Sequence, residues 1–301
     1  MSTVNRNLRS KFSKLARFAG AALLAVGAAP GALAQNSNSI VESAADRATY
    51  VDLVTLAERS ELVIRVEIRR QTQLKPERAP GLEPGFARLY IEADTQALIA
   101  GNTSIGESLV YLVDVPLTAK GKAPKLKKRP MILFANTVPG RPATQRGTEI
   151  QLTAKNAQLD YSPAFEARLR RVLTSLAGAD VPPKIDGIAD ALAVPGTLAG
   201  ESETQIFLRT ADQSPVSITV LRRPGLRPVW GVSWGEIVDS AARAPAENTL
   251  RWYRLACSLP RELPSNANLA RDSSARRLAA NDYRFVVDGL GECTRAITEA
   301  E

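Results

Sequence analysis

The chain has 301 residues, with 39 Lys+Arg against 31 Asp+Glu, two cysteines and no histidine. Its 45% hydrophobic and 23% charged residues are typical of a globular protein and exclude a disordered or collagen-like chain. Without histidine there can be no Ser-His-Asp or Cys-His catalysis and no histidine-ligated zinc site. Two cysteines are too few for a cysteine-ligated zinc site or an iron–sulfur cluster. We therefore assign no metal, no cofactor and no catalytic residue, and the composition favours a protein that is not an enzyme.

The first 34 residues have the pattern of a secretory signal peptide. Five cations and no acid precede an apolar stretch over residues 18–29, and Ala32, Leu33 and Ala34 have the small-x-small form of a cleavage site. An uncleaved membrane anchor would need about 20 apolar residues, more than this stretch contains. Cleavage near Ala34 would leave 34 Lys+Arg against 31 Asp+Glu, so the charge predicts no nucleic-acid partner. We expect a periplasmic or secreted protein with no transmembrane segment in the mature chain.

The residues that follow predict a barrel or a sandwich. Residues 35–48 are polar, as in a flexible leader, and residues 49–59 have the apolar spacing of a short helix. Residues 61–69 alternate between apolar and polar side chains, which is typical of a strand with one buried face. Four more strands are predicted, over residues 86–97, 109–115, 131–138 and 148–153. Five strands without a long helix between them predict an antiparallel β-barrel or β-sandwich domain over residues 49–155.

The strand spacing of this first domain resembles that of OB-like and netrin-like barrels, in which a first strand ending in basic residues leads to a long second strand. The resemblance covers the first half of the mature chain and matches no residue motif, so it implies the barrel fold and no functional residue. The chain as a whole is similar to exported bacterial proteins without a known mechanism, which implies no activity.

Residues 156–200 are predicted to connect this domain to a second one. Ser162 and Pro163 suit the N-cap and the first position of a helix, and the apolar spacing continues to Gly178. Residues 180–200 are rich in Pro and Gly and are predicted to be an irregular linker.

Residues 201–301 are predicted to form an α+β domain. Turn-forming residues separate three strands of a β-meander, over residues 204–210, 216–222 and 229–234. Two helices follow, over residues 247–259 and 273–288. Strands followed by helices predict an α+β fold for this domain, and the chain as a whole is expected to be α+β.

Basic residues crowd the segment between the third and fourth predicted strands. They are Lys120, Lys122, Lys125, Lys127, Lys128 and Arg129, and no acid lies among them. Near an anionic surface each cation contributes about 1 kcal/mol, so the segment could bind an anionic envelope polymer or lipid headgroups. It has no aromatic residue that could stack on nucleic-acid bases. The alternative interpretation is a solvated hairpin loop whose lysines oppose edge-to-edge aggregation.

The two cysteines, Cys257 and Cys293, are expected to form a disulfide, because an even number of cysteines in an oxidising compartment normally pairs. Their positions raise a geometric difficulty. One lies near the end of the first C-terminal helix and the other just beyond the second, so a simple antiparallel hairpin of helices would keep them apart. The bridge therefore requires that the helices cross steeply or that the tail folds back.

Two further patterns bear on catalysis. Residues 231–235 read GxSxG, which in hydrolases places a serine on an exposed elbow, but Ser233 has no histidine to activate it. We expect a chance match in which the glycines let the strand pass close to its neighbours. Paired carboxylates can cleave glycosides without histidine, so Glu201, Glu203 and Glu236 remain candidates for that reaction.

Three functions stay open on the sequence. The lack of catalytic groups favours a non-catalytic binding module of the cell envelope, whose partner is another envelope protein or an anionic polymer. The alternatives are a carboxylate-dependent hydrolase of envelope glycans and an envelope assembly factor. Turnover that is abolished by a Glu→Gln change would favour the hydrolase, and a stable co-purifying partner would favour the assembly factor.

Overall fold

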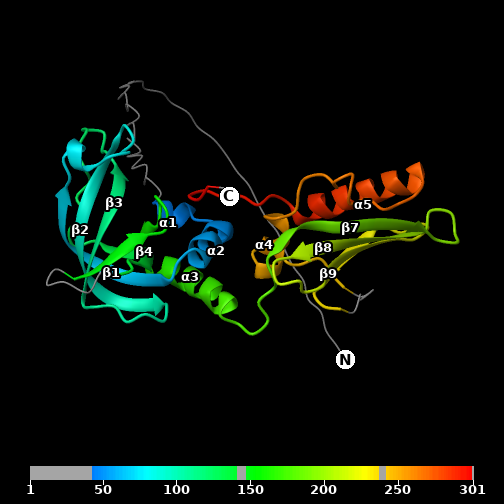
Figure 1. Cartoon of the computed structure of the whole chain (residues 1–301), viewed down its shortest axis with the longest axis horizontal. Helices are drawn as coiled ribbons and strands as arrows, with labels where there is room; N and C mark the ends of the chain where they lie inside the picture. The colour runs from blue at the N-terminus through cyan, green and yellow to red at the C-terminus, as the bar shows by residue number, and fades with distance from the viewer. Residues whose placement is uncertain (1–42, 141–146, 237–241, 300–301) are drawn as a thin grey trace, which may run out of the picture. The chain divides into compact units, whose positions relative to one another are not determined.

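The computed structural model describes residues 43–140, 147–236 and 242–299 (Figure 1). The predicted signal peptide and its cleavage site near Ala34 lie outside these residues. The described chain forms a closed five-strand barrel and a second, antiparallel four-strand sheet, together with five α-helices, which confirms the predicted α+β fold class. No helix within the described ranges is long and apolar enough to cross a membrane.

The barrel consists of β1 (Leu62–Gln73), β2 (Phe86–Ala100), β3 (Ser108–Pro116), β4 (Pro130–Thr137) and β5 (Thr148–Leu152). Its strands follow the order β1-β2-β3-β5-β4, and β4 pairs in turn with β1, which closes the barrel. All of these pairings are antiparallel except that of β3 with β5, which is parallel and contains only two residue pairs. A short strand, β6 (Gln158–Asp160), lies beside β4 in continuation of β5. A 3-10 turn, η1 (Pro76–Arg78), lies between β1 and β2.

The alternation of side chains along β1 places one set in the barrel interior. Leu62, Ile64, Val66 and Ile68 are fully buried there and pack against apolar residues from the other four strands. The pairing of β1 with β2 contains register shifts, and such bulges bend a strand and increase its twist. This bending helps β1 to pair with β2 on one side and with β4 on the other.

Three helices cover the outer face of β1 and β4: α1 (Ala44–Arg47), α2 (Tyr50–Glu58) and α3 (Pro163–Leu176). Ile132 and Phe134 of β4 point toward these helices and are fully buried, so β4 is apolar on both faces, as predicted for a buried strand. Ser162 caps α3 and Pro163 is its first residue, which confirms the predicted start of this helix. The end of the predicted flexible leader is ordered instead, because α1 buries Ala45 in the same core.

The second sheet consists of β7 (Ile185–Pro195), β8 (Ser202–Thr210), β9 (Val216–Arg222) and β10 (Val229–Ser233), in the order β10-β9-β8-β7. The last three strands confirm the predicted meander. The prediction of an irregular linker over residues 180–200 is wrong for β7. The prolines of this stretch flank the strand or end it, and two register shifts, one at Gly187, interrupt the alternation that would have revealed it.

Two helices complete the second part: α4 (Leu250–Ala256) and α5 (Ser273–Leu290). Helix α5 packs on one face of the sheet, where Ile206 and Ile218 are fully buried beneath it (Figure 1). Asp282 of α5 is also fully buried; it accepts a hydrogen bond from the Thr204 hydroxyl at 2.5 Å and forms an ion pair with Arg222 at 2.5 Å. A buried carboxylate is tolerated here because two strands supply its partners.

Cys257 and Cys293 form the predicted disulfide, with their Cα atoms 5.1 Å apart. Each cysteine follows the C-terminal end of a helix, so both helices must end near the same place. The chain after Cys257 makes this possible by returning along β7, where Ala191 donates a hydrogen bond to the Ala267 carbonyl and accepts one from the Leu269 amide. Helix α5 begins only after this return, which removes the geometric difficulty.

The tail after Cys293 is held on α2 by a buried carboxylate. Asp52 is fully buried and accepts hydrogen bonds from the amides of Ala296 (3.0 Å), Ile297 (3.3 Å) and Thr298 (2.9 Å). Burial alone would raise the pKa of Asp52, but hydrogen bonds from Thr298, Thr49 and Ala296 outweigh it and hold that pKa below its usual value.

A second buried charge joins α2 to α4. Arg254 is 4% exposed and donates to both carboxylate oxygens of Glu58, at 2.6 and 3.0 Å, and to the Pro182 carbonyl at 3.2 Å. Such a bidentate pair fixes the orientation of both side chains. Helix α2 therefore contacts α4 as well as the tail.

Candidate functional site

The six predicted cations lie on residues 117–129, which connect β3 to β4 and are called the basic segment below. The interpretation of this segment as a hairpin loop is wrong, because β3 pairs with β2 and β5 whereas β4 pairs with β1, β5 and β6. The segment instead passes from one strand of the closed barrel to another that is not its neighbour.

The backbone of the basic segment is anchored to the barrel. Leu126 is 4% exposed and packs in the barrel core. Gln71 of β1 donates to the Pro124 carbonyl at 2.8 Å and accepts from the Leu126 amide at 2.5 Å. Lys128 donates its backbone amide to the Ile68 carbonyl at 2.7 Å. These bonds hold the backbone of residues 124–128 against β1.

The cationic side chains of the basic segment are exposed. Arg129 pairs with Asp160 at 2.5 Å, but within the described ranges no ion pair reaches any of the five lysines, Lys120, Lys122, Lys125, Lys127 and Lys128. Lys128 has a φ of 65°, the left-handed conformation that favours glycine, and it follows Lys127 in a turn closed by a bond from the Arg129 amide to the Leu126 carbonyl at 2.9 Å. Among the described residues, five lysines without an ion-pair partner therefore lie on a backbone that is anchored to β1 at Pro124, Leu126 and Lys128.

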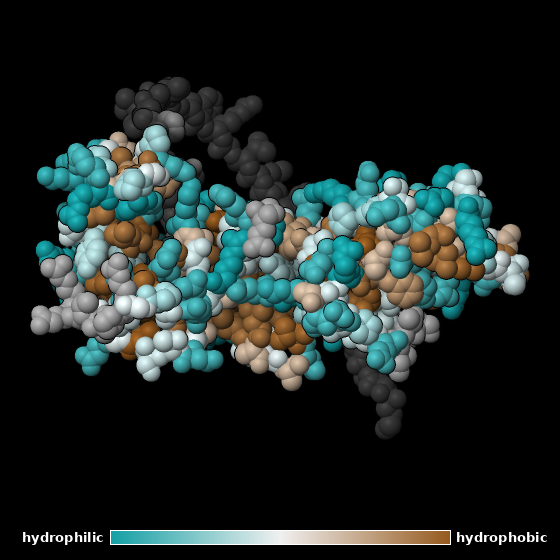
Figure 2. Space-filling view, in the orientation of Figure 1, coloured by the Kyte–Doolittle hydropathy of each residue, from teal (hydrophilic) through white to brown (hydrophobic). Residues whose placement is uncertain are grey.

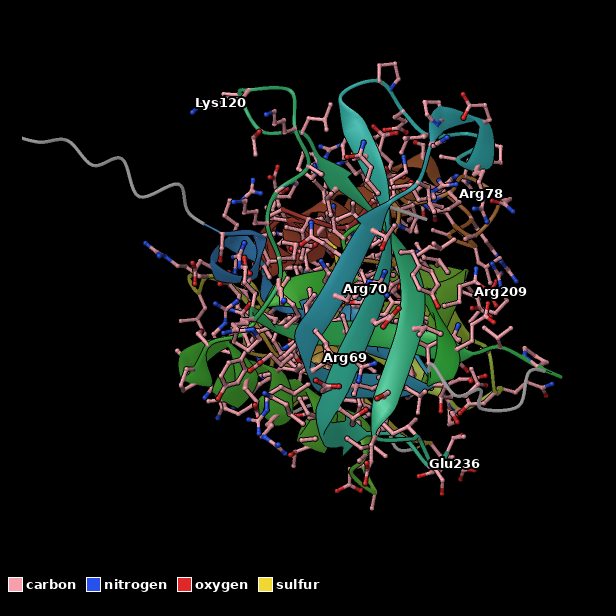
Figure 3. All side chains as sticks on the ribbon, turned by 90° about the vertical axis from the view of Figure 1, so that its left-hand side faces the viewer. Arg69, Arg70, Arg78, Lys120, Arg209 and Glu236 are labelled. Atoms are coloured by element: carbon pink, nitrogen blue, oxygen red, sulfur yellow. A yellow bond between two sulfur atoms is a disulfide. The ribbon has the colours of Figure 1, made fainter. Side chains whose placement is uncertain are left out.

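The loop between β1 and β2 lies at the same end of the barrel, since the Leu117 amide bonds the Gly85 carbonyl at 2.8 Å. Figure 3 shows Arg78 of this loop and Lys120 of the basic segment in the upper part of the view, with Arg69 and Arg70 further down the barrel wall. The loop adds two cations and two acids, and one of the acids, Glu83, is paired with Lys155. The excess of positive charge at this end therefore comes from the basic segment.

The barrel wall is open beside this end. Strands β3 and β5 pair only at Leu109–Thr148 and Val110–Glu149, and beyond these pairs they separate. A cavity of about 660 Å³ lies in the opening, within the size range of small-molecule pockets. Half of its lining residues are apolar, and its polar lining residues are Arg88, Tyr90, Tyr111, Asp114, Glu149, Gln151 and Lys155.

The charges of this cavity largely neutralise one another. Arg88 holds Asp114 through two hydrogen bonds of 2.7 Å each, and this bonding raises the pKa of Arg88. Lys155 is hydrogen-bonded to Glu83, which raises the pKa of the lysine. Burial raises the pKa of Tyr111, whose hydroxyl donates to Gln158 at 2.7 Å, so this phenol acts as a neutral hydrogen-bond donor. The cavity suits an uncharged, partly apolar ligand better than an anion.

Sequence reasoning missed these cavity residues. Arg88 and Asp114 stand opposite each other in the β2–β3 register, and both lie within strands that the sequence predicts. Pairing the two predicted strands would have brought the two charges together. The separation of β3 from β5 has no comparable local signal.

The structure brings two of the three candidate carboxylates to one place. Glu201 and Glu203 both line a cavity of about 630 Å³ at the turn between β7 and β8. Glu201 accepts from the Leu198 amide at 3.3 Å, and Glu203 accepts from Gln205 at 2.5 Å.

Glu236 lies apart from this pair. Glu203 of β8 and Val229, the first residue of β10, both pair with Leu221 of β9, so they lie at the same level of the sheet. Glu236 comes after Ser233, the last residue of β10. A strand of that length spans about 13 Å. Glycosidase carboxylates lie at most about 9.5 Å apart, so Glu236 and Glu203 do not form such a pair.

Ser233 is the last residue of β10 and is buried, so it does not stand on an exposed elbow. A Cβ atom on Gly231 would lie 2.0 Å from the Ala242 carbonyl oxygen, which agrees with a glycine that permits a close backbone approach. Within the described ranges, no group of three or more Cys, Asp or Glu residues could hold a metal ion.

The barrel thus presents a charged surface, the basic segment, with a cavity of mixed polar and apolar lining beside it. No family model matches the chain, and no curated protein matches it either.

Proposed function

We propose that this protein is an exported, non-catalytic binding module that recognises phosphate-bearing anionic surfaces of the cell envelope through the basic segment. The disulfide between Cys257 and Cys293 is consistent with an oxidising compartment such as the periplasm or the cell exterior.

One observation carries this function. Five exposed lysines project from a single anchored segment, and none of them has an ion-pair partner within the described residues. Exposed cations that are not neutralised locally are available to an external anion. Because Leu126 and Gln71 already fix the backbone, binding would order only the lysine side chains, and the entropic cost stays small.

The expected affinity is electrostatic. Each lysine near an anionic membrane surface contributes about 1 kcal/mol, so five together correspond to about three to four orders of magnitude in affinity. Exposed charges are screened by salt, and at about 1 M ionic strength the screening length falls to about 3 Å. Binding should therefore be strong at low salt and weak at high salt.

The test is co-sedimentation of the full, disulfide-bonded chain with vesicles that contain phosphatidylglycerol. Phosphatidylcholine vesicles provide the neutral comparison, and soluble polyphosphate as a competitor distinguishes a general phosphate site from one that needs a membrane. The variant replaces Lys120, Lys122, Lys125 and Lys127 by Gln and Lys128 by Asn, because Asn tolerates the left-handed conformation.

The matched control removes the same number of exposed cations elsewhere, by changing Arg171, Lys184, Arg227, Arg277 and Arg284 to Gln. Loss of binding in the first variant and retention in the control would support this function. Equal binding of the two variants would mean that net charge alone acts, and would refute a role for the basic segment.

A further inference from the structure

The sheet of β7 to β10 has a helix on one face only. The opposite face of β7 and β8, called the open face below, is formed by the side chains that alternate with the buried ones. They are Leu192, Val194, Asp190, Glu203, Gln205, Phe207 and Arg209. On the β10 side, Ala242 and Arg243 lie against Gly231, so the exposed part of this face belongs to β7 and β8.

The open face is rich in exposed apolar side chains. Leu192 is 40% exposed, Phe207 is 43% exposed and Val194 is 52% exposed. The cavity of about 630 Å³ at the turn between the two strands hollows this face between Leu192, Val194 and Leu221. Figure 2 shows hydrophobic side chains at the surface over the hairpin of β7 and β8. Exposed apolar side chains that gather on one surface can mark an interaction site.

The edges of the sheet are less accessible to a partner protein than the open face is. The β7 edge is occupied by the returning chain, which bonds Ala191 through Ala267 and Leu269. The β10 edge is approached by Arg243, whose carbonyl accepts from the Val232 amide at 3.4 Å. The chain itself thus already occupies the β7 edge at Ala191 and the β10 edge at Val232. A second sheet can pack on the open face, about 10 Å away.

The charges on β8 indicate which partner fits. Its outward residues read Glu203, Gln205, Phe207 and Arg209, so an acid and a base stand at equal distances from Ile206. A two-fold axis at Ile206 would bring Glu203 of one copy opposite Arg209 of a second copy, twice. A patch that complements itself under two-fold rotation is the property that an isologous dimer requires.

Both charged side chains are exposed on the open face. Glu203 is exposed, and its described partner is the Gln205 amide of the same strand. Arg209 lies over Gly187 and donates to the carbonyls of Asp186 and Ile188, both at 3.4 Å. Within the described ranges, neither side chain has an ion pair. Figure 3 shows Arg209 at the surface.

We propose that the open face is a homodimer interface in which a second copy of this chain packs on β7 and β8 about a two-fold axis near Ile206. Glu203 of each copy faces Arg209 of the other. The same rotation places Phe207 of one copy opposite Gln205 of the other, and Leu192 opposite Asp190. This dimer does not depend on the function proposed for the basic segment.

Sedimentation of the full chain over a wide range of concentrations, together with two charge reversals, tests this dimer. Glu203→Arg and Arg209→Glu each place like charges opposite one another, so each variant alone should dimerise at least about tenfold more weakly than the wild type. An equal mixture of the two variants restores every opposite-charge contact and should dimerise again, as should the double variant. This rescue also shows that the single variants are folded.

Each possible result either supports or overturns the proposed dimer. A wild-type chain that stays monomeric overturns the dimer. Single variants that dimerise as well as the wild type place the interface elsewhere. Weakening without rescue in the mixture overturns the pairing of Glu203 with Arg209, and restoration in the mixture supports it.

Discussion

Asp52 is fully buried, yet six hydrogen bonds reach its two carboxylate oxygens. Two come from Thr49 at the start of α2, and four come from the tail residues Ala296, Ile297 and Thr298. One side chain therefore caps a helix and holds a segment about 245 residues away in sequence. Hydrogen bonds to an ionised acceptor of this kind are stronger than those between neutral groups.

We expect Asp52→Asn to lower the free energy of unfolding by about 3 kcal/mol, because an amide cannot accept from both sets of donors. The wild type should also lose stability in acid. The folded-state pKa lies below the unfolded value of about 3.9, so the stabilisation is present above that pH and is lost as the pH falls toward the folded pKa. Urea unfolding at a series of pH values measures both effects.

The exposed residue Asp46 provides the control, because Asp46→Asn should change the free energy of unfolding only slightly. Equal stability of the Asp52→Asn variant and the wild type between neutral pH and pH about 3 would contradict the role of this carboxylate.

A substitution at Lys128 should change the stability of the fold and the affinity for anionic vesicles in opposite directions. Its left-handed conformation costs a lysine about 1 kcal/mol relative to glycine. Lys128→Gly should therefore raise the free energy of unfolding by about 1 kcal/mol while it lowers the affinity for anionic vesicles about fivefold. The neighbouring Lys127 is not among the residues with positive φ, so Lys127→Gly should lose both stability and affinity. A Lys128→Gly variant that is less stable than the wild type would contradict this reading of the turn.

Elements with strong local signals could be predicted from the sequence. The alternation of Leu62, Ile64 and Val66 fixes which face of β1 is buried, and Ser162 with Pro163 marks the start of α3. Strand β7 was missed because register shifts at its bulges interrupt this alternation. Local patterns identify an element only where its geometry is regular.

The same limit applies to the candidate site. The six cations of the basic segment are evident in the sequence, but its path between strands that are not neighbours depends on the closure of the barrel. Its anchor, Leu126, lies among lysines and has no periodic apolar neighbours. The cavity beside it exists because β3 and β5 separate after two residue pairs, and no local pattern encodes that separation.

The disulfide links the ends of α4 and α5 across 36 residues of sequence. Closing a loop of this length should stabilise the fold by about 3 to 4 kcal/mol in the chain-entropy model. We expect the double variant Cys257→Ala, Cys293→Ala to lose about this amount in urea unfolding. A matching loss on reduction of the wild type would exclude an effect of the alanines themselves. Unchanged stability in both experiments would show that packing alone holds the two helix ends.

For the molecule as a whole, the two proposals concern different surfaces of the chain. The basic segment belongs to the barrel, and the open face belongs to the second sheet. A dimer would carry two basic segments, and two linked sites bind an extended surface more tightly than one. The monomeric charge-reversal variants should therefore bind anionic vesicles more weakly than the wild type, although each keeps all five lysines.

The dependence of vesicle affinity on salt concentration probes the basic segment more sharply than any other measurement. A logarithmic plot of affinity against salt should fall steeply for the wild type and for the control that lacks five cations elsewhere, because the lysines of the basic segment make the contacts. The variant without those five lysines should give a weak affinity and a nearly flat line. Wild-type affinity that does not change with salt, or the same slope for all three proteins, would contradict recognition by this segment.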